Sequence, residues 1–168
     1  EVNTGMSGRY MAYVGSYSYT GKAKGITVFD VDVEKGTFKE RCEMEVNNSS
    51  YVIASSDGKT LYSIADEGVV SFRILQNGAL ARLNSAPIRG MRGCHLCSDL
   101  EDKFIFVSGY HDGKTTILSL NKDGSVGGIV DGVYDKGYGS VAERNFRPHV
   151  TCTRRMPDNK YVLSVDNG

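Results

Sequence analysis

The sequence lacks any long apolar run and carries no excess of charge of either sign. No stretch approaches about 18 apolar residues, and no charged start is followed by an apolar segment, which argues against a spanning helix or a signal peptide. Twenty acidic and 20 basic residues cancel, so no net field draws the chain to nucleic acid, an anionic membrane or a polyacidic substrate. A small metabolite remains compatible, and we expect a soluble, cytoplasmic protein.

Cysteine is also scarce, and its spacing gives little support for a metal site. Cys42, Cys94, Cys97 and Cys152 are too few for a disulfide framework at this length, so free thiols are expected. Cys94 and Cys97 flank His95 with residue types that bind zinc, but a closed site needs four ligands and no second Cys-x-x-C pair exists. We therefore predict neither a metal nor a cofactor.

Helical patterning and two common catalytic motifs are absent as well. No window repeats apolar residues at intervals of three and four, whereas β-branched and aromatic runs bounded by Gly and Asp recur throughout. The sequence contains no Gly-x-Ser-x-Gly elbow and no glycine-rich loop that matches a phosphate-binding fingerprint. An all-β chain is indicated, and a serine hydrolase is disfavoured.

What the chain does contain is an internal repeat. Strand–turn–strand segments begin at Tyr51, His95 and His149, and their turns end at lysines that are 44 and 57 residues apart. A second hairpin alternates with the first, and its turn glycines, Gly36, Gly78 and Gly124, are 42 and 46 residues apart. Repeats of about 40–50 residues fit the four-stranded blades of a β-propeller. The longer last interval holds a Gly-rich, polar stretch, 127–145, which we expect to be a surface loop.

The repeat count predicts an incomplete β-propeller. Residues 9–168 would form about three to three and a half four-stranded blades, and residues 1–8 would be an N-terminal extension or tag remnant. An unclosed stack leaves an apolar blade face and strand edges exposed. We therefore expect a fragment, or a chain that completes its core by self-association or with a complementary C-terminal half through the open blade face.

Several segments resemble the seven-bladed lactonase family, which includes the propeller-type 6-phosphogluconolactonases. They are Tyr13-Val-Gly-Ser16-Tyr17, Ser56-Asp-Gly-Lys59, Gly93-Cys-His95 and Arg147-Pro-His149. The similarity covers residues 10–168 and would match the N-terminal half of family members. One departure is Pro148-His149-Val150-Thr151, which lacks the second histidine of the Pro-His-x-His found in many relatives.

The resemblance implies a toroid with its site at the mouth of the central channel. Its implied activity is hydrolysis of 6-phosphogluconolactone, a sugar lactone, in the pentose phosphate pathway of glucose metabolism. A related branch forms lactones by cycloisomerisation of muconates. Because fold does not fix function, a non-enzymatic binding scaffold also stays open.

Candidate site residues follow from the chemistry of lactone hydrolysis, which needs a base, oxyanion donors and a cation for a substrate phosphate. His95 and His149 open successive repeats, and we expect them at the same register and the same end of the propeller. Glu67 lies at the exit of the first repeat, where it could orient water or a histidine. Arg147, two residues before His149, would share its strand face and bind substrate. Alternating tyrosines are expected to pack within a blade rather than stack on a sugar: Tyr10, Tyr13, Tyr17 and Tyr19.

Overall fold

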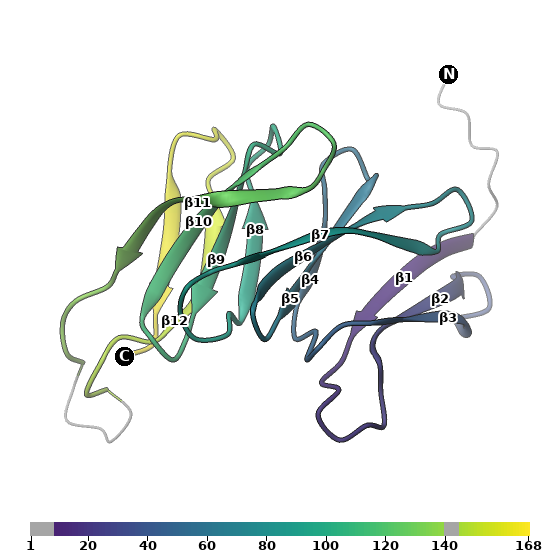
Figure 1. The fold of residues 1–168 in the computed structure, drawn as a ribbon, viewed down its shortest axis with the longest axis horizontal. Helices are drawn as coiled ribbons and strands as arrows, with labels where there is room; N and C mark the ends of the chain where they lie inside the picture. The colour runs from purple at the N-terminus through teal and green to yellow at the C-terminus, as the bar shows by residue number, and fades with distance from the viewer. Residues whose placement is uncertain (1–8, 140–144) are drawn as a thin grey trace.

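The computed structural model describes residues 9–139 and 145–168 as strands joined by turns and loops (Figure 1). The extension expected at residues 1–8 lies outside the described residues. The described part of the chain holds 13 strands, and no helix in it is long and apolar enough to cross a membrane.

The strands form four antiparallel sheets, which we call blades 1 to 4. Blade 1 contains β1 (Arg9–Gly15), β2 (Gly25–Asp32) and β3 (Thr37–Glu45). Blade 2 contains β4 (Val52–Ala54), β5 (Thr60–Ala65), β6 (Gly68–Ile74) and β7 (Leu80–Pro87). Blade 3 contains β8 (His95–Ser98), β9 (Phe104–Gly109), β10 (Lys114–Leu120) and β11 (Val126–Tyr134). Blade 4 contains β12 (Val150–Arg155) and β13 (Val162–Asp166).

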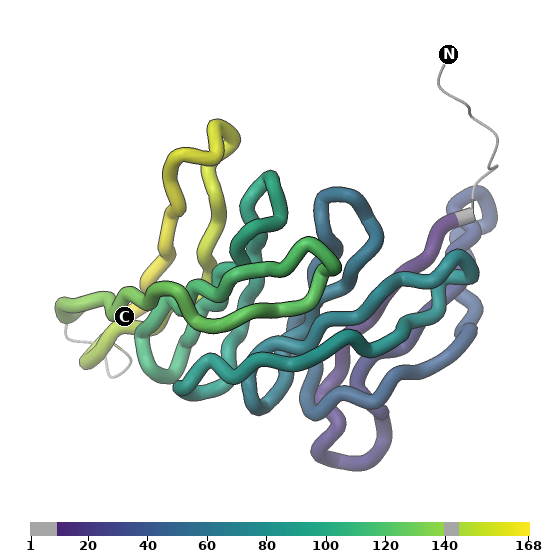
Figure 2. Tube along the Cα trace, turned by 45° about the horizontal axis from the view of Figure 1, so that its top comes forward, coloured from purple at the N-terminus to yellow at the C-terminus, as the bar shows by residue number. Residues whose placement is uncertain are grey.

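Within each blade the strands follow one another in sequence order, and the blades succeed one another along the long axis of the molecule (Figure 2). The first strands of blades 2, 3 and 4 lie against their neighbours, because β8 contacts both β4 and β12. Side chains near the ends of these three strands line a groove of about 350 Å³. These strands therefore form the inner edge of the stack.

Apolar side chains pack between successive blades. The cluster between blades 1 and 2 includes Ile26, Val28 and Phe72, each with no exposed surface. The cluster between blades 2 and 3 includes Ile64, Ile105 and Leu118, which are also fully buried. Strand β5 is buried at all six positions because it is central in its sheet and covered on both faces. The core thus consists of layers between sheets, and the expected all-β partial propeller is confirmed.

One expected loop is a strand instead. Residues 126–134 form β11, which pairs with β10 as the fourth strand of blade 3 and carries two register shifts. All its residues after Gly127 are exposed. Three of its nine residues are glycines, which weaken a strand signal, so the segment looked like a loop although Ile129, Val130 and Val133 are apolar.

Blade 4 presents an uncovered face. Every residue of β13 is exposed, including Leu163 and Val165, and the neighbouring Tyr161 is exposed too. These three apolar side chains have no covering blade among the described residues. This arrangement matches the open blade face expected from the repeat count.

Candidate functional site

His149 lies immediately before β12 and is held from three sides. Its ring stacks on Tyr110 with centroids 4.4 Å apart, and Phe146 meets it edge-on at 6.2 Å. Its backbone N–H donates to Asp166 Oδ1 at 2.7 Å, and its Nδ1 is 2.8 Å from the carbonyl oxygen of Tyr110. A carbonyl oxygen only accepts, so Nδ1 carries the proton and Nε2 keeps its lone pair. Nε2 has no hydrogen-bond partner among the described residues, although the side chain is only 5% exposed.

Arg147 lies beside His149 in an irregular segment. Residues 146–147 form a bend and β12 begins only at Val150, so the alternation rule that placed Arg147 on the face of His149 does not apply. The two residues nevertheless meet at one ring, because the Arg147 guanidinium carbon lies 5.3 Å from the centroid of Phe146. The structure therefore places an exposed cation next to a histidine whose Nε2 has no partner in the described part of the chain.

His95 occupies a different environment, inside the inner edge of the stack. Its ring lies 4.6 Å from that of Tyr51 of blade 2, and its Nε2 is 3.6 Å from Cys152 Sγ of blade 4. The Thr153 N–H points at His95 Nδ1 at 3.5 Å, so Nδ1 is the acceptor. Burial lowers the pKa of His95, and the charge of Arg154 lowers it further. His95 is thus a neutral, 7% exposed ring wedged between blades.

The expectation that His95 and His149 share a register is wrong. Tyr51 and His95 each stand eight residues before their turn lysine, Lys59 and Lys103, whereas His149 stands 11 residues before Lys160. Cys152 takes the eight-residue position, and a register shift between Val150 and Cys152 separates it from His149. The equivalent positions are therefore Tyr51, His95 and Cys152, which contact one another in a row.

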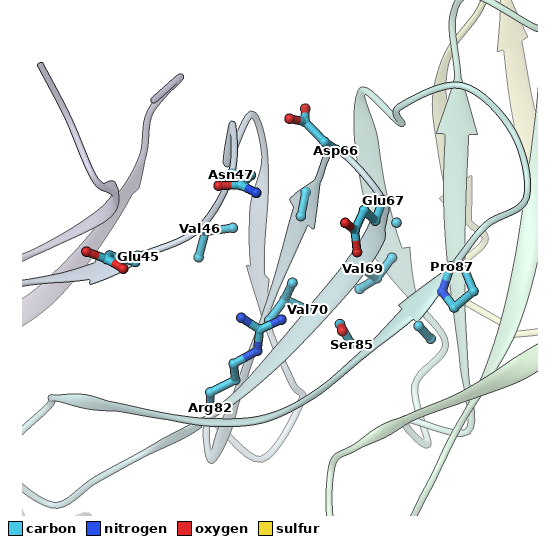
Figure 3. A pocket seen from close by; sticks show the side chains of 13 residues that line it. Glu45, Val46, Asn47, Asp66, Glu67, Val69, Val70, Arg82, Ser85 and Pro87 are labelled. Carbon is cyan, nitrogen blue, oxygen red and sulfur yellow. The ribbon is translucent and has the colours of Figure 1, made fainter. Parts of the chain in front are cut away.

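Glu67 does not join either histidine. It lines a groove of about 390 Å³ between blades 1 and 2, together with Glu45, Asn47 and Arg82. Figure 3 shows the Glu67 carboxylate and the Arg82 guanidinium pointing into this groove, while Asp66 points away from it. The structure shows no contact of Glu67 with His95 or His149.

A polar cluster that the sequence did not predict connects blades 1, 2 and 3. Arg92 Nη1 donates to Asp66 Oδ1 at 2.9 Å, and Asn48 Nδ2 donates to both Asp66 oxygens at 3.0 and 2.8 Å. The Arg92 guanidinium carbon also lies 4.9 Å from the centroid of Tyr17. No sequence motif predicts this cluster. The only available signal was that its residues stand just before or after strands of the blades.

The tyrosine prediction holds for one residue of four. Tyr13 packs against the core between blades 1 and 2, but Tyr10, Tyr17 and Tyr19 are exposed. β1 ends at Gly15, so Tyr17 and Tyr19 belong to the connection to β2 and not to an alternating strand. The spacing of the tyrosines thus extends past the end of β1, so it does not mark strand residues there.

The four cysteines are free thiols. Cys94 Sγ donates to the carbonyl oxygen of Val150 at 3.4 Å, and burial raises the pKa of this thiol. Within the described residues, no three His, Cys, Asp or Glu side chains are grouped so that they could hold a metal ion. Cys97 is buried within β8, and Cys94 lies immediately before that strand.

Comparison with known proteins places the chain in a family. Residues 11–168 match the model of the family described as lactonase, 7-bladed beta-propeller. The chain belongs to the seven-bladed β-propeller lactonase family. Membership agrees with the four successive blades.

Relatives within the lactonase family are about twice as long as this chain. It is 32% identical to a 6-phosphogluconolactonase of Bacillus subtilis over 95% of this chain and 47% of the relative. A solved structure of a candidate 6-phosphogluconolactonase from Bacteroides fragilis superposes with a TM-score of 0.88 at 32% identity, covering 99% of this chain and 47% of the other. A periplasmic gluconolactonase of Pseudomonas aeruginosa shares the fold, with a TM-score of 0.85 at 22% identity over 94% of this chain and 47% of the other.

Proposed function

We propose that the protein hydrolyses 6-phosphoglucono-1,5-lactone to 6-phosphogluconate when the remaining blades of the ring are present. The family membership and the B. subtilis relative support the reaction class and the substrate. The observation that carries the proposal is the His149 tautomer, fixed by the Tyr110 carbonyl at 2.8 Å. A cytoplasmic location is part of the proposal and agrees with the four free thiols.

His149 supplies the base in this proposal. Its Nε2 lone pair takes a proton from water as the water oxygen attacks the lactone carbonyl carbon. The resulting imidazolium then gives that proton to the ring oxygen as the ester bond breaks, which releases the hydroxy acid. Stacking on Tyr110 and the Nδ1–H bond to its carbonyl keep the ring from rotating, so the position of Nε2 is fixed.

Arg147 supplies the cation. Its guanidinium can donate two parallel hydrogen bonds to a phosphate or stabilise the oxyanion that forms at the carbonyl. Contact with the Phe146 ring restricts the side chain, and no carboxylate among the described residues takes up its N–H groups. We assign no step to His95 or Glu67, because His95 is wedged between blades and Glu67 faces a separate groove.

The test measures lactone hydrolysis by the longest natural polypeptide that contains this chain. His149→Gln is expected to lower kcat by about a hundredfold or more, as the loss of a general base does. The matched control is His111→Gln, because His111 is an exposed turn residue next to the same Tyr110 ring. Unchanged kcat in a folded His149→Gln protein would exclude His149 as the base.

Arg147 is tested by comparing two substrates. Arg147→Ala is expected to raise KM for the phosphorylated lactone by about tenfold while leaving KM for glucono-1,5-lactone nearly unchanged, because only the phosphate loses a charge-assisted contact. An equal loss for both substrates with a lower kcat would instead place Arg147 at the oxyanion.

A further inference from the structure

The connection between β1 and β2 is fixed by one buried side chain. Asn48 is 9% exposed, and its Oδ1 accepts from the backbone N–H groups of Ser18 and Tyr19 at 2.9 and 3.1 Å. Its own N–H donates to Ser18 Oγ at 3.0 Å, and Ser18 Oγ donates to the Val46 carbonyl at 3.3 Å. These bonds attach the connection of blade 1 to the entry of blade 2, so its side chains project from a rigid support.

This fixed connection presents two aromatic rings to solvent. Tyr17 is 49% and Tyr19 is 77% exposed, and their centroids lie 5.9 Å apart with the ring planes at 66°. The two rings therefore form a corner. In Figure 1 the connection extends beyond the lower end of the β1 and β2 strands and is not covered by another blade. Two adjoining aromatic rings on a fixed support offer a preformed apolar surface to a ligand.

Polar groups with unused hydrogen-bonding capacity adjoin the corner. Arg92 lies against the Tyr17 ring and uses one N–H for Asp66, and its other N–H groups have no partner among the described residues. Asp66 Oδ1 accepts from Arg92 and Asn48 and Oδ2 accepts from Asn48, so one lone pair, on Oδ2, is left for a ligand. The two opposite charges cancel, so this surface favours a neutral ligand that both donates and accepts hydrogen bonds.

We propose that Tyr17, Tyr19, Asp66 and Arg92 form a binding subsite for the ring of a neutral pyranose. The C–H face of such a ring is apolar and slightly positive, which suits the negative face of a tyrosine ring. Its vicinal hydroxyls both donate and accept, which suits a neighbouring carboxylate and guanidinium. The subsite is distinct from the His149 centre and does not depend on lactone hydrolysis.

The test is saturation-transfer NMR of this chain with methyl β-D-glucopyranoside. Saturable binding on the order of millimolar is expected, with transfer strongest at the ring C–H protons because these lie on tyrosine. Tyr19→Ala should weaken binding at least fivefold, and Tyr19→Phe should keep it because the ring remains. The control is Tyr138→Ala, since Tyr138 is 86% exposed and has no described ring partner.

Three results would overturn the proposal. They are the absence of saturable binding, an equal loss on Tyr138→Ala, and displacement of the glucoside by inorganic phosphate, which would show an anion site at Arg92 instead. An amide fingerprint spectrum of each variant shows whether it is folded. His149→Gln should leave glucoside binding unchanged, so failure of the proposed hydrolysis and failure of this subsite are separately visible.

Discussion

The two buried histidines differ in the nitrogen that each leaves free. His149 donates from Nδ1 to the Tyr110 carbonyl, and its Nε2 has no partner within residues 9–139 and 145–168. His95 instead accepts at Nδ1 from Thr153 and points Nε2 at Cys152. Their exposed fractions, 7% for His95 and 5% for His149, do not distinguish the two residues. The sequence could indicate both residues as candidates, but the orientation of each ring depends on partners in other blades, 39 residues away for His149 and 57 for the Cys152 contact of His95.

His95 should make the stability of the chain depend on pH. Burial lowers its pKa in the folded state, so the unfolded chain, with a pKa of about 6.5, binds the proton first. The stabilisation is therefore present above about pH 6.5 and is lost as the pH falls through and below it. Urea denaturation at about pH 7.5 and 5.5 should show a larger loss for the wild type than for His95→Gln. Equal losses would mean that another group causes the dependence.

The effect of Gly→Ala on stability can be compared at a crowded glycine, Gly68, and at an open one, Gly128. Gly68 has a φ of 151°, and a Cβ there would collide with the Ala86 carbonyl oxygen. Gly128 has no atom near its Cβ position and no positive φ. We expect Gly68→Ala to lower the free energy of unfolding by about 2–4 kcal/mol and Gly128→Ala to change it by less than about 0.5 kcal/mol. Thermal and urea unfolding measure both, and similar values would contradict the backbone argument.

At the scale of elements, turn chemistry was the reliable signal. The Asp57-Gly58-Lys59 turn joins β4 to β5 with Gly58 at a φ of 68°, as an Asp-Gly hairpin predicts. Strand β11 was missed because three of its nine residues are glycines, and the register of β12 was missed because a bulge adds residues without changing the pattern. The sequence therefore predicted the turns well, but it did not predict an outer strand or a bulge.

Blades 3 and 4 are joined by a buried group of hydroxyls. Thr153 of β12 accepts from Ser108 of β9 at 2.8 Å and is 3.2 Å from the Thr115 hydroxyl of β10. Thr153→Val should cost about 1–3 kcal/mol, because it leaves two buried hydroxyls with fewer partners. Adding Ser108→Ala should cost less than the sum of the two single changes. Strict additivity in urea unfolding would show that the hydroxyls are independent.

At the scale of the whole molecule, the uncovered face of blade 4 should govern association. Leu163 and Val165 of β13 are exposed together with Tyr161. We expect the chain to associate in sedimentation experiments as its concentration rises, either with itself or with an added complementary half, because apolar area leaves water. The double variant Leu163→Lys and Val165→Lys should sediment as a monomer over the same range. A wild-type chain that stays monomeric throughout would contradict this expectation.

The order of strands has a consequence for biosynthesis. Each blade is made from strands that are consecutive in sequence, and each pairs only with the strand before or after it. A blade therefore needs no residue that is synthesised long after its own last strand, and pairing over such short separations is fast. Blade 2 can form on the ribosome while blade 3 is still being translated, and each new sheet then covers the apolar face of the one before it. The apolar face of the newest blade stays exposed until the next blade covers it, and a chaperone would have to act there.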